Sequence, residues 1–341
     1  MLVKIGLSSL LIASVLFATS AKDEDMSKWL RPSTVPQPKN NKLTKERIEL
    51  GRYLYFDERL SKSGKISCAT CHHPHRGWTD LKPVAKAVGH AGRVGPRNSP
   101  TILNAAYQKH QFWDGRAKSL EEQALGPIEA DVEMNMPLDA LEKKIKSIKG
   151  YRELFAKAYP GEKITAKTIA KAIASFERTV VSTESPFDKY IKGDKTALTT
   201  QQKRGWKLFK GKGHCTDCHD NFNFTDGSFH NIGLHDGELK GKELGRYNVK
   251  PRKAWYGVFK TPTLRDVAKS YPYFHDGSVK TLTEATAICG NGGRFDRNVK
   301  NKSTYMKDRH LTKQEITDIV AFMEALSGPD VDVKIPTKFP Q

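Results

Sequence analysis

The spacing of apolar residues along the chain predicts helices and almost no strands. Thr44 stands where its side chain can cap a helix, and apolar residues then recur on one helix face as far as Leu54. The apolar positions on this face are Ile48, Leu50, Tyr53 and Leu54. The same pattern appears twice more. Residues 164–180 predict a helix with Ile169, Ile173, Phe176 and Val180 on one face, and Thr312 with Glu315 forms a capping box before Ile316, Ile319, Val320, Met323 and Leu326.

A weak internal repeat links the two halves of the chain. Residues 205–209 (GWKLF) follow a Leu-Thr-Thr segment much as residues 51–54 (GRYL) follow Leu43 and Thr44. Each of these amphipathic stretches precedes a pair of cysteines. The repeat predicts two similar helical domains, and the length of 341 residues agrees with two. We place the domains at residues 43–185 and 186–328.

The remaining segments are expected to lie outside the two helical domains. Residues 1–21 have one Lys, an apolar run and small residues up to Ala21, which predicts a signal peptide cleaved near Ala21. The run is too short to span a membrane, so we expect an exported, periplasmic protein without a membrane span. Residues 22–42 are polar and contain prolines, which predicts an extended arm that does not pack. Residues 220–255 predict an irregular loop, and residues 329–341 a tail.

The five cysteines of the chain predict its chemistry as well as its fold. Four of them form two Cys-x-x-Cys-His motifs, Cys68 to His72 and Cys215 to His219. This spacing is typical of covalent c-type haem attachment, in which Cys68, Cys71, Cys215 and Cys218 bond two porphyrins and the histidines bind iron. A zinc site or a thioredoxin-like pair needs no histidine after the second cysteine. We therefore expect an all-α protein of two cytochrome c-like domains, each with one haem, joined around an inter-domain cleft.

The chain is strongly basic, with a formal net charge of +19. Basic proteins often bind nucleic acid, but an exported haem protein rarely meets any, so we expect no nucleic-acid partner. The charge either steers the protein towards an acidic redox partner or serves solubility alone. The sequence leaves these two uses open.

Several motifs resemble those of the bacterial dihaem cytochrome c peroxidases and their MauG-type relatives. They are residues 60–64 (LSKSG), 95–101 (GPRNSPT), 111–116 (QFWDGR), 121–124 (EEQA), 132–134 (VEM) and 273–277 (YFHDG). The likeness runs from about Leu43 to Gly328 and surrounds both haem motifs. It implies that the first haem, with His72 as proximal ligand, is the peroxidatic one, and that the second haem delivers electrons.

The resemblance assigns roles to three residues around the first haem. His90 matches a distal histidine that caps the iron in the resting enzyme and leaves when the other haem is reduced, and its neighbours Gly89 and Gly92 would let it move. Glu133 matches a distal carboxylate that moves protons during cleavage of the peroxide bond. Trp113 matches a tryptophan between the haems. Each residue also has an ordinary interpretation. His90 would then be a surface histidine, Glu133 a glutamate beside a helix, and Trp113 an aromatic residue of the core.

The resemblance also implies a calcium ion between the domains. Asn98 and the carbonyl groups of Ser270 and Pro272 match its ligands, and such oxygen donors suit calcium, although the family usually has Thr where Ser270 stands. His275 resembles a residue near the second haem that does not bind iron. We expect His73, His75, His214 and His230 to be solvated.

Cys289 departs from the family pattern. The peroxidases have a methionine at this position as distal ligand of the second haem, and the MauG-type enzymes have a tyrosine. We predict that Cys289 binds the second iron as a thiolate, which would lower the reduction potential of that haem. The alternative is a neutral thiol, with the ligand absent or supplied by Met306.

Three functions remain to be separated. The first is reduction of hydrogen peroxide to water with electrons from a small cytochrome or cupredoxin, and we prefer it because of His90 and Glu133. The second is MauG-type oxidation of residues in a partner protein, which Gly292 and Gly293 favour. The third is a plain electron carrier, which would need neither His90 nor Glu133. A homodimer is also expected to be possible because relatives commonly dimerise.

Overall fold

The computed structural model describes residues 25–234, 243–294 and 301–341, so the predicted signal peptide lies outside the described residues. The described part is mostly helical. Its α-helices are α1 Lys45–Phe56, α2 Cys68–Cys71, α3 Leu120–Glu129, α4 Leu138–Ser147, α5 Lys149–Ala158, α6 Ala166–Glu177, α7 Pro186–Ile191, α8 Thr200–Lys210, α9 Leu282–Gly290 and α10 Lys313–Glu324. Short 3-10 helices are Ser27–Trp29, Glu58–Leu60, Pro74–Arg76, His90–Gly92, Ala105–Tyr107, Cys215–Asp217, Arg246–Asn248, Lys253–Trp255 and Val267–Lys269.

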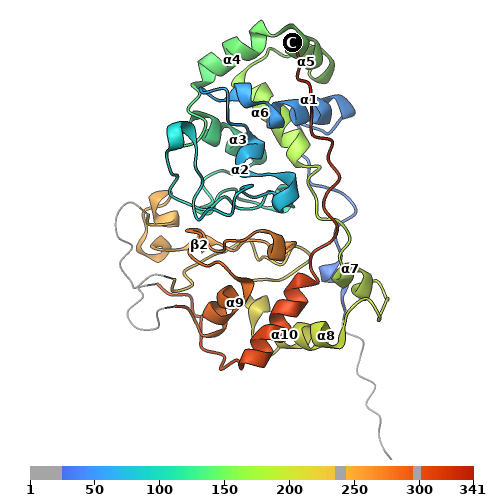
Figure 1. Ribbon diagram of the computed structural model, residues 1–341, viewed down its shortest axis with the longest axis vertical. Helices are drawn as coiled ribbons and strands as arrows, with labels where there is room; N and C mark the ends of the chain where they lie inside the picture. The colour runs from blue at the N-terminus through green and yellow to red at the C-terminus, as the bar shows by residue number, and fades with distance from the viewer. Residues whose placement is uncertain (1–24, 235–242, 295–300) are drawn as a thin grey trace, which may run out of the picture.

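One small antiparallel sheet accompanies the helices in the described residues. Strands β1 Phe229–His230 and β2 Phe259–Lys260 pair with Phe229 opposite Lys260. In Figure 1 the helices gather at the two ends of the molecule, and β2 lies with loop-rich segments between them. The segment predicted as an irregular loop therefore contains a strand, β1, within its described part.

The predicted helix starts are confirmed. The side chain of Thr44 accepts a hydrogen bond from the Arg47 amide at 3.2 Å, which caps α1. Thr312 and Glu315 form the predicted capping box at the start of α10. The helix predicted over residues 164–180 appears as the shorter α6, Ala166–Glu177, and Val180 lies beyond its end.

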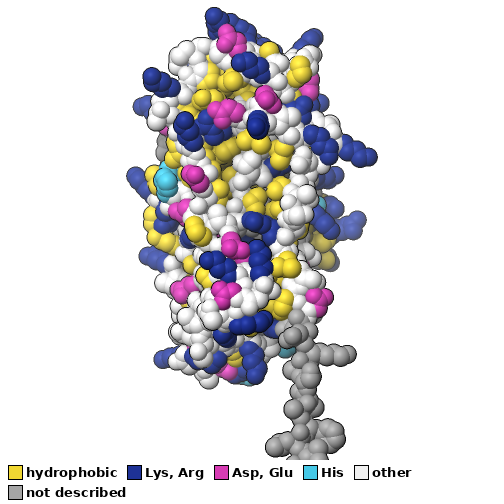
Figure 2. Space-filling view, turned by 90° about the vertical axis from the view of Figure 1, so that its right-hand side faces the viewer, with side chains coloured by type: hydrophobic (Ala, Val, Ile, Leu, Met, Phe, Trp, Pro, Cys, Tyr) yellow, Lys and Arg dark blue, Asp and Glu magenta, His cyan; other side chains and the backbone are white. Residues whose placement is uncertain are grey.

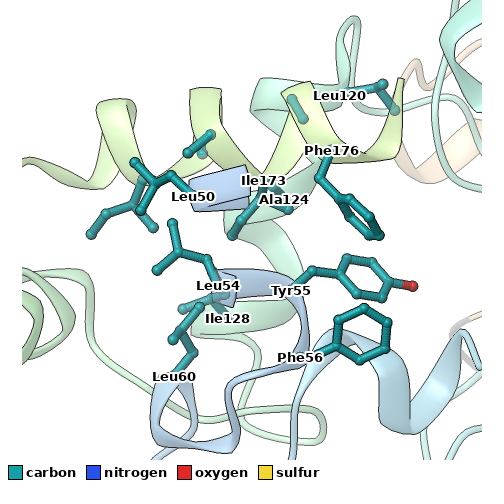
Figure 3. Packing of buried hydrophobic residues seen from close by; sticks show 14 of the residues in the cluster. Leu50, Leu54, Tyr55, Phe56, Leu60, Leu120, Ala124, Ile128, Ile173 and Phe176 are labelled. Atoms are coloured by element: carbon teal, nitrogen blue, oxygen red, sulfur yellow. The ribbon is translucent and has the colours of Figure 1, made fainter. Parts of the chain in front are cut away.

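The first hydrophobic core is built where α1 crosses α6. A Cβ atom on Gly51 would lie 1.9 Å from the carbonyl oxygen of Ala172, so only glycine lets the two helices approach this closely. The crossing brings Tyr55 and Phe176 together, with ring centroids 5.0 Å apart. Figure 3 shows the aliphatic side chains that fill the space beside these rings. The core extends from Leu50 to Val180.

The second core repeats this arrangement with α8 and α10. A Cβ atom on Gly205 would lie 1.9 Å from the carbonyl oxygen of Asp318. Gly51 and Gly205 hold the same place in the repeat seen in the sequence, and each helix that carries one precedes a cysteine motif. The two-domain helical fold is thus confirmed. Apart from Trp29, the buried residues of the second core run from Phe187 to Leu326.

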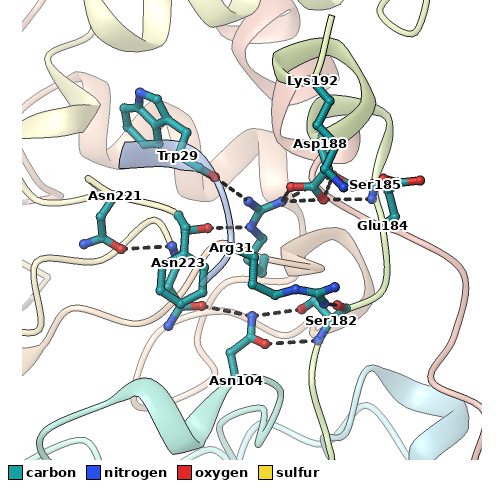
Figure 4. A network of polar contacts seen from close by, with 12 residues as sticks. Trp29, Arg31, Asn104, Ser182, Glu184, Ser185, Asp188, Lys192, Asn221 and Asn223 are labelled. Carbon is teal, nitrogen blue, oxygen red and sulfur yellow. Dashed lines mark hydrogen bonds and ion pairs between the residues drawn. The ribbon is translucent and has the colours of Figure 1, made fainter. Parts of the chain in front are cut away.

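The prediction that residues 22–42 form an unpacked arm is wrong for the described part, residues 25–42. Trp29 is 1% exposed and packs in the second core, with its ring centroid 5.0 Å from that of Trp206. Its carbonyl oxygen accepts a hydrogen bond from Arg265, and Arg31 donates to the carbonyl oxygen of Ser182. Figure 4 shows this network. The segment packs although most of its residues are polar or proline, because burial of the large Trp29 indole removes much apolar surface from water.

Asn41, at the other end of the arm, is buried against the first domain. Its side-chain amide donates to Glu121 and to the carbonyl oxygen of Lys171, both at 2.9 Å. The arm therefore begins in the second core and ends at the first.

The C-terminal tail also connects the two domains. It leaves α10 and runs along the molecule to the first domain (Figure 1). There its carbonyl groups accept hydrogen bonds from Arg52, Arg59 and the Gly150 amide, at 2.5, 2.9 and 2.6 Å. Val331, Val333 and Phe339 pack against the first core.

The distribution of surface charge and the length of the helices are relevant to nucleic-acid and membrane partners. On the face in Figure 2, Lys and Arg side chains are scattered over both halves with acidic side chains between them, and they do not form one basic stripe. Among the described residues no helix combines the length and the apolar character that crossing a membrane requires.

Candidate functional site

The first cysteine motif forms the short helix α2, and this turn holds the histidine in a defined orientation. The His72 amide donates to the carbonyl oxygen of Cys68 at 3.0 Å. Nδ1 of His72 lies 3.3 Å from the carbonyl oxygen of Trp78, which suits an Nδ1–H donor and leaves Nε2 for a metal. Burial lowers the pKa of His72, which favours the neutral imidazole that binds iron.

The second motif repeats this geometry. The His219 amide donates to the carbonyl oxygen of Cys215 at 2.8 Å, and Nδ1 of His219 lies 2.8 Å from the carbonyl oxygen of Phe224. Burial lowers the pKa of His219 as well. Both histidines are therefore held through Nδ1 with Nε2 available.

Each motif lines its own cavity. The cavity of the first motif measures about 50 Å³, and that of the second about 220 Å³. None of the five cysteines forms a disulfide, so both cysteines of each motif are available for thioether bonds. Two thiols, an apolar wall and an available imidazole nitrogen face each space, so the residues fit a covalently held haem at both cavities.

Glu133 lines the first cavity together with Cys68, Cys71 and His72. It lies after α3, where its amide donates to the carbonyl oxygen of Ala130 at 3.0 Å. Burial raises the pKa of the Glu133 carboxyl, and the positive charge of Arg116 opposes this shift. A buried carboxyl group beside the cavity can accept a proton from a bound molecule and return it.

The loop that carries His90 lies directly on the backbone of Glu133. The His90 amide donates to the Glu133 carbonyl oxygen at 2.7 Å, and a Cβ atom on Gly89 would lie 2.1 Å from the carbonyl oxygen of Val132. Gly89 lines the cavity, whereas His90 is not among its lining residues. Nδ1 of His90 is buried without a hydrogen-bond partner in the described part of the chain.

Trp113 lies at the second cavity, on the side of the first domain. Its indole N–H donates to the carbonyl oxygen of Asn98 at 2.9 Å, and its own carbonyl oxygen accepts from the Lys260 amide at 2.7 Å. His275 also lines this cavity and stacks on Phe259, with ring centroids 3.6 Å apart.

Of the three residues expected to bind calcium, Asn98 lies at the contact between the domains. Its backbone amide donates to the carbonyl oxygen of His275 at 2.7 Å, and its side-chain Nδ2 donates to the carbonyl oxygen of Ala85 at 3.2 Å. Nδ2 is thus engaged, and Oδ1 is the side-chain atom able to bind a cation. Ser270 and Pro272 lie in the segment that precedes His275, where the Tyr271 carbonyl oxygen accepts from Arg76 at 3.2 Å.

Cys289 lies on α9 and lines the second cavity with Cys215, Cys218 and His219. Its side chain is accessible from this cavity, while the protein around it raises the pKa of its thiol to about 11. Met306 lines the same cavity. The structure thus brings both sulfur ligands considered from the sequence to the second site.

Comparisons with known proteins agree with this geometry. A family model described as di-haem cytochrome c peroxidase matches residues 45–196, and one described as cytochrome c matches residues 202–327. The methylamine utilization protein MauG of Methylorubrum extorquens is 42% identical over 91% of this chain and 86% of its own length. The cytochrome c551 peroxidase of Nitrosomonas europaea is 42% identical over 84% of this chain and 82% of its own. This chain belongs to the dihaem cytochrome c peroxidase and MauG family. It is an oxidoreductase, and its two cytochrome c domains imply two haems.

A solved structure supports the family assignment. The crystal structure of a MauG-like protein associated with microbial copper homeostasis has a TM-score of 0.81 and 31% identity, and the match covers 91% of this chain and 96% of that one. MauG proteins and peroxidases thus both stand among the similar proteins of this family.

One of the histidines expected to be solvated, and not a ligand, is less exposed than expected. His230 was expected to be solvated, but its side chain is 14% exposed and lines the second cavity. Its Nε2 lies 2.8 Å from Asp226, and this hydrogen bond raises the pKa of His230 to about 10. Its partner lies only four residues away along a segment without periodicity, so the sequence carried no sign of the pair. His75 and His214 are exposed as expected, and His73 is partly exposed.

Two charged residues of the cavities were missed by the sequence. Glu177, at the end of α6, is 5% exposed and lines the first cavity, and its Oε2 has no hydrogen-bond partner among the described residues. Lys260 is 9% exposed and lines the second. Neither belongs to the motifs analysed above, so no spacing distinguished them from surface charges.

Proposed function

We propose that this family member reduces hydrogen peroxide to water at the first haem, with electrons that a small cytochrome or cupredoxin delivers through the second haem. The observation that carries the proposal is the carboxyl group of Glu133 on the wall of the cavity that Cys68, Cys71 and His72 share. A plain electron carrier needs no such group. The balance is one peroxide, two electrons and two protons to two molecules of water.

Glu133 is the proton-moving residue in this proposal. The haem, when bound, supplies the iron that binds peroxide and the electrons that cleave it. Glu133 accepts a proton from one peroxide oxygen and returns it to the other, which leaves as water. The raised pKa of Glu133 suits the first step, because a carboxylate with a higher pKa is a stronger base. Two further protons come from solvent.

We assign His90 the role of the resting-state iron ligand, which must leave before peroxide can bind. The position of its loop beside Glu133 supports this, since one movement of residues 89–92 would open the site. Gly92 has a φ of +73°, and nothing lies within 4 Å of the place that a Cβ atom would take there, so the loop has room and backbone freedom at that end. Trp113, between the second cavity and Asn98, is assigned to electron passage between the domains.

We also propose one calcium ion bound by Asn98 Oδ1 and the carbonyl oxygens of Ser270 and Pro272. The location of Asn98 between the domains supports this site, because an ion there would join the segments that carry Trp113 and His275. Elemental analysis of the purified protein tests it. About one calcium per chain is expected in the parent protein, and much less after Asn98→Ala.

Cys289 is proposed as the distal ligand of the second iron. Its position on the cavity wall supports the assignment, and so does the softness of sulfur, although Met306 competes for the role. Electron paramagnetic resonance of the ferric protein decides between them. A low-spin thiolate signal that vanishes in Cys289→Ser but persists in Met306→Leu is expected, and an unchanged spectrum in Cys289→Ser would refute the assignment.

The alternative function is MauG-type oxidation of residues in a partner protein. Cys289 favours it, because an anionic sulfur ligand lowers the potential of the second haem and weakens electron uptake from high-potential donors. The identity of 42% to a MauG protein supports this alternative as well as the identity of 42% to a peroxidase supports the first function. Under either function we propose an exported, periplasmic protein that is able to form a homodimer.

Steady-state peroxide consumption with a reduced small cytochrome separates the two functions. Sustained turnover is expected, with two molecules of cytochrome oxidised for each peroxide. Negligible turnover in both the fully reduced and the half-reduced protein would overturn the peroxidase proposal. The reduced cytochrome mixed with peroxide alone serves as the control for their direct reaction.

A further inference from the structure

Lys260 holds a fixed place at the boundary between the two domains. It ends β2, where it pairs with Phe229 of β1, and its amide donates to the carbonyl oxygen of Trp113 at 2.7 Å. Figure 1 places β2 between the two groups of helices. The backbone of Lys260 is therefore tied to both domains, and the residue lines the second cavity.

The ammonium group of Lys260 has no carboxylate partner among the described residues. Its Nζ donates to Oε1 of Gln108, which is neutral, and only 9% of the residue is exposed. Burial without a compensating charge lowers its pKa to about 8. A lysine this deeply buried ordinarily has an anionic partner.

Two other buried cations among the described residues have an anionic partner. Arg178 pairs with Glu121 at 2.8 Å, and Arg265 pairs with Asp188 at 2.9 Å. Arg246 donates instead to the carbonyl oxygen of Asp114 and lies 3.8 Å above the ring of Phe229, contacts that suit a delocalised guanidinium. The compact ammonium of Lys260 has neither kind of partner in the described part of the protein.

We propose that Lys260 binds a propionate carboxylate of the second haem and thereby sets the orientation and the reduction potential of that haem. The cavity that Lys260 lines is also lined by Cys215, Cys218 and His219, so the haem attached there brings two carboxylates. A propionate is thus the anion that the cavity itself supplies. The inference depends on the second haem and is independent of peroxidase activity.

This assignment fixes which edge of the second haem faces the first domain. Gln108 and Trp113 belong to the first domain, so the propionate edge lies on the side that faces it. A cation close to the haem also stabilises the reduced iron, because reduction removes one positive charge from the centre. Lys260 is therefore a positioning residue that raises the potential of the second haem.

The test uses the full-length protein with both haems, and three variants. Lys260→Met removes the charge with little change of shape, Lys260→Arg keeps it, and Lys280→Met removes an exposed lysine as the matched control. Haem content is measured first, by the pyridine haemochrome spectrum. The potential of each haem then comes from a spectroelectrochemical titration, and redox-difference infrared spectra are recorded with haem carrying ¹³C in its propionates.

We expect Lys260→Met to lower the potential of the second haem and to shift its propionate band. Lys260→Arg should keep the potential near that of the parent protein but still shift the band, because the donor has changed. Lys280→Met should alter neither. A propionate band that is identical in the parent and in Lys260→Arg would overturn the proposal, even if Lys260→Met fails to keep its haem. So would a potential of the parent protein that depends on chloride concentration, because a mobile anion would then be the partner.

Discussion

Glu133 lies on the wall of the first cavity, where burial raises the pKa of its carboxyl group. As the proposed base it must be ionised, so kcat/KM for peroxide should fall as the pH drops through its pKa in the folded protein. Glu133→Gln keeps the shape and removes the base, and we expect turnover to fall by about 10²–10⁴-fold with both haems retained. The pH–rate profile of the variant should lose its acid limb. Unchanged turnover would mean that another group moves the proton.

Glu177 offers a prediction about stability at the same cavity. Burial raises its pKa to about 8, whereas the ordinary pKa of a glutamate is 4.5. Below the lower value both the folded and the unfolded chain hold the proton, so folding costs nothing extra. Above it the unfolded chain ionises while the folded chain keeps its proton, and the folded state loses stability progressively until about pH 8. The cost is greatest there and above.

Glu177→Gln should remove this cost. We expect the variant to be more stable than the parent protein by about 1–3 kcal/mol at about pH 8, and by much less at about pH 5. Chemical unfolding of the haem-loaded protein at the two pH values measures the difference. Glu129→Gln, at an exposed position, should change stability little at either pH. An equal gain at both pH values would show that the proton plays no part.

Single residues are where sequence reasoning had least to work with. The cysteine motifs identified both haem sites because their spacing states the chemistry directly. Trp29, His230, Glu177 and Lys260 carry no such pattern, since each acts through partners that only the folded chain brings together. A proline-bearing segment with one tryptophan predicts an unpacked arm, because the sequence does not show the hydrophobic core that receives the Trp29 side chain. The roles of His90, Glu133 and Cys289 stay predictions that rest on the resemblance.

At the scale of elements, the repeated glycine contact explains why the two halves fold alike. Gly51 and Gly205 each let a helix approach a partner so closely that a Cβ atom would lie 1.9 Å from a backbone carbonyl oxygen. Alanine at either position must push α1 from α6, or α8 from α10. We expect each substitution to lower the free energy of unfolding by about 1–3 kcal/mol, because backbone cannot yield as a side chain can.

The matched control is Gly95→Ala, where the nearest atom to a Cβ would lie at 3.5 Å, an ordinary contact. It should change the free energy of unfolding by less than about 0.5 kcal/mol. Haem content of all three variants checks whether the helix shift reaches the motifs. The helix periods themselves were visible in the sequence, but the residue at each crossing was not, because a glycine in a helix gives no sign of what it touches.

At the scale of the whole molecule, the N-terminal arm and the C-terminal tail each connect the two domains. The N-terminal arm begins in the second core and reaches the first, and the C-terminal tail leaves the second domain and binds the first. Sequence patterns could not predict these connections, because both segments lack periodicity and gain their partners from a distant domain. The two cavities are held together by these segments and by the contacts of Trp113, Asn98 and Lys260. We expect these contacts to couple a change at the second haem to the loop that carries His90.

This coupling, together with the proposed role of His90, predicts that peroxide reacts faster after reduction. An iron capped by His90 cannot bind peroxide, so the fully oxidised protein should react with it slowly, and reduction of the second haem should accelerate the reaction. His90→Gly should react quickly without prior reduction, because the cap is gone. His75→Gly, at an exposed position on the same domain, should behave like the parent protein. Stopped-flow spectra of each protein mixed with peroxide, before and after reduction by one electron, measure the rates. Equal rates for the parent protein in both redox states would remove the gating role of His90 while leaving the proton transfer by Glu133 open to its own test.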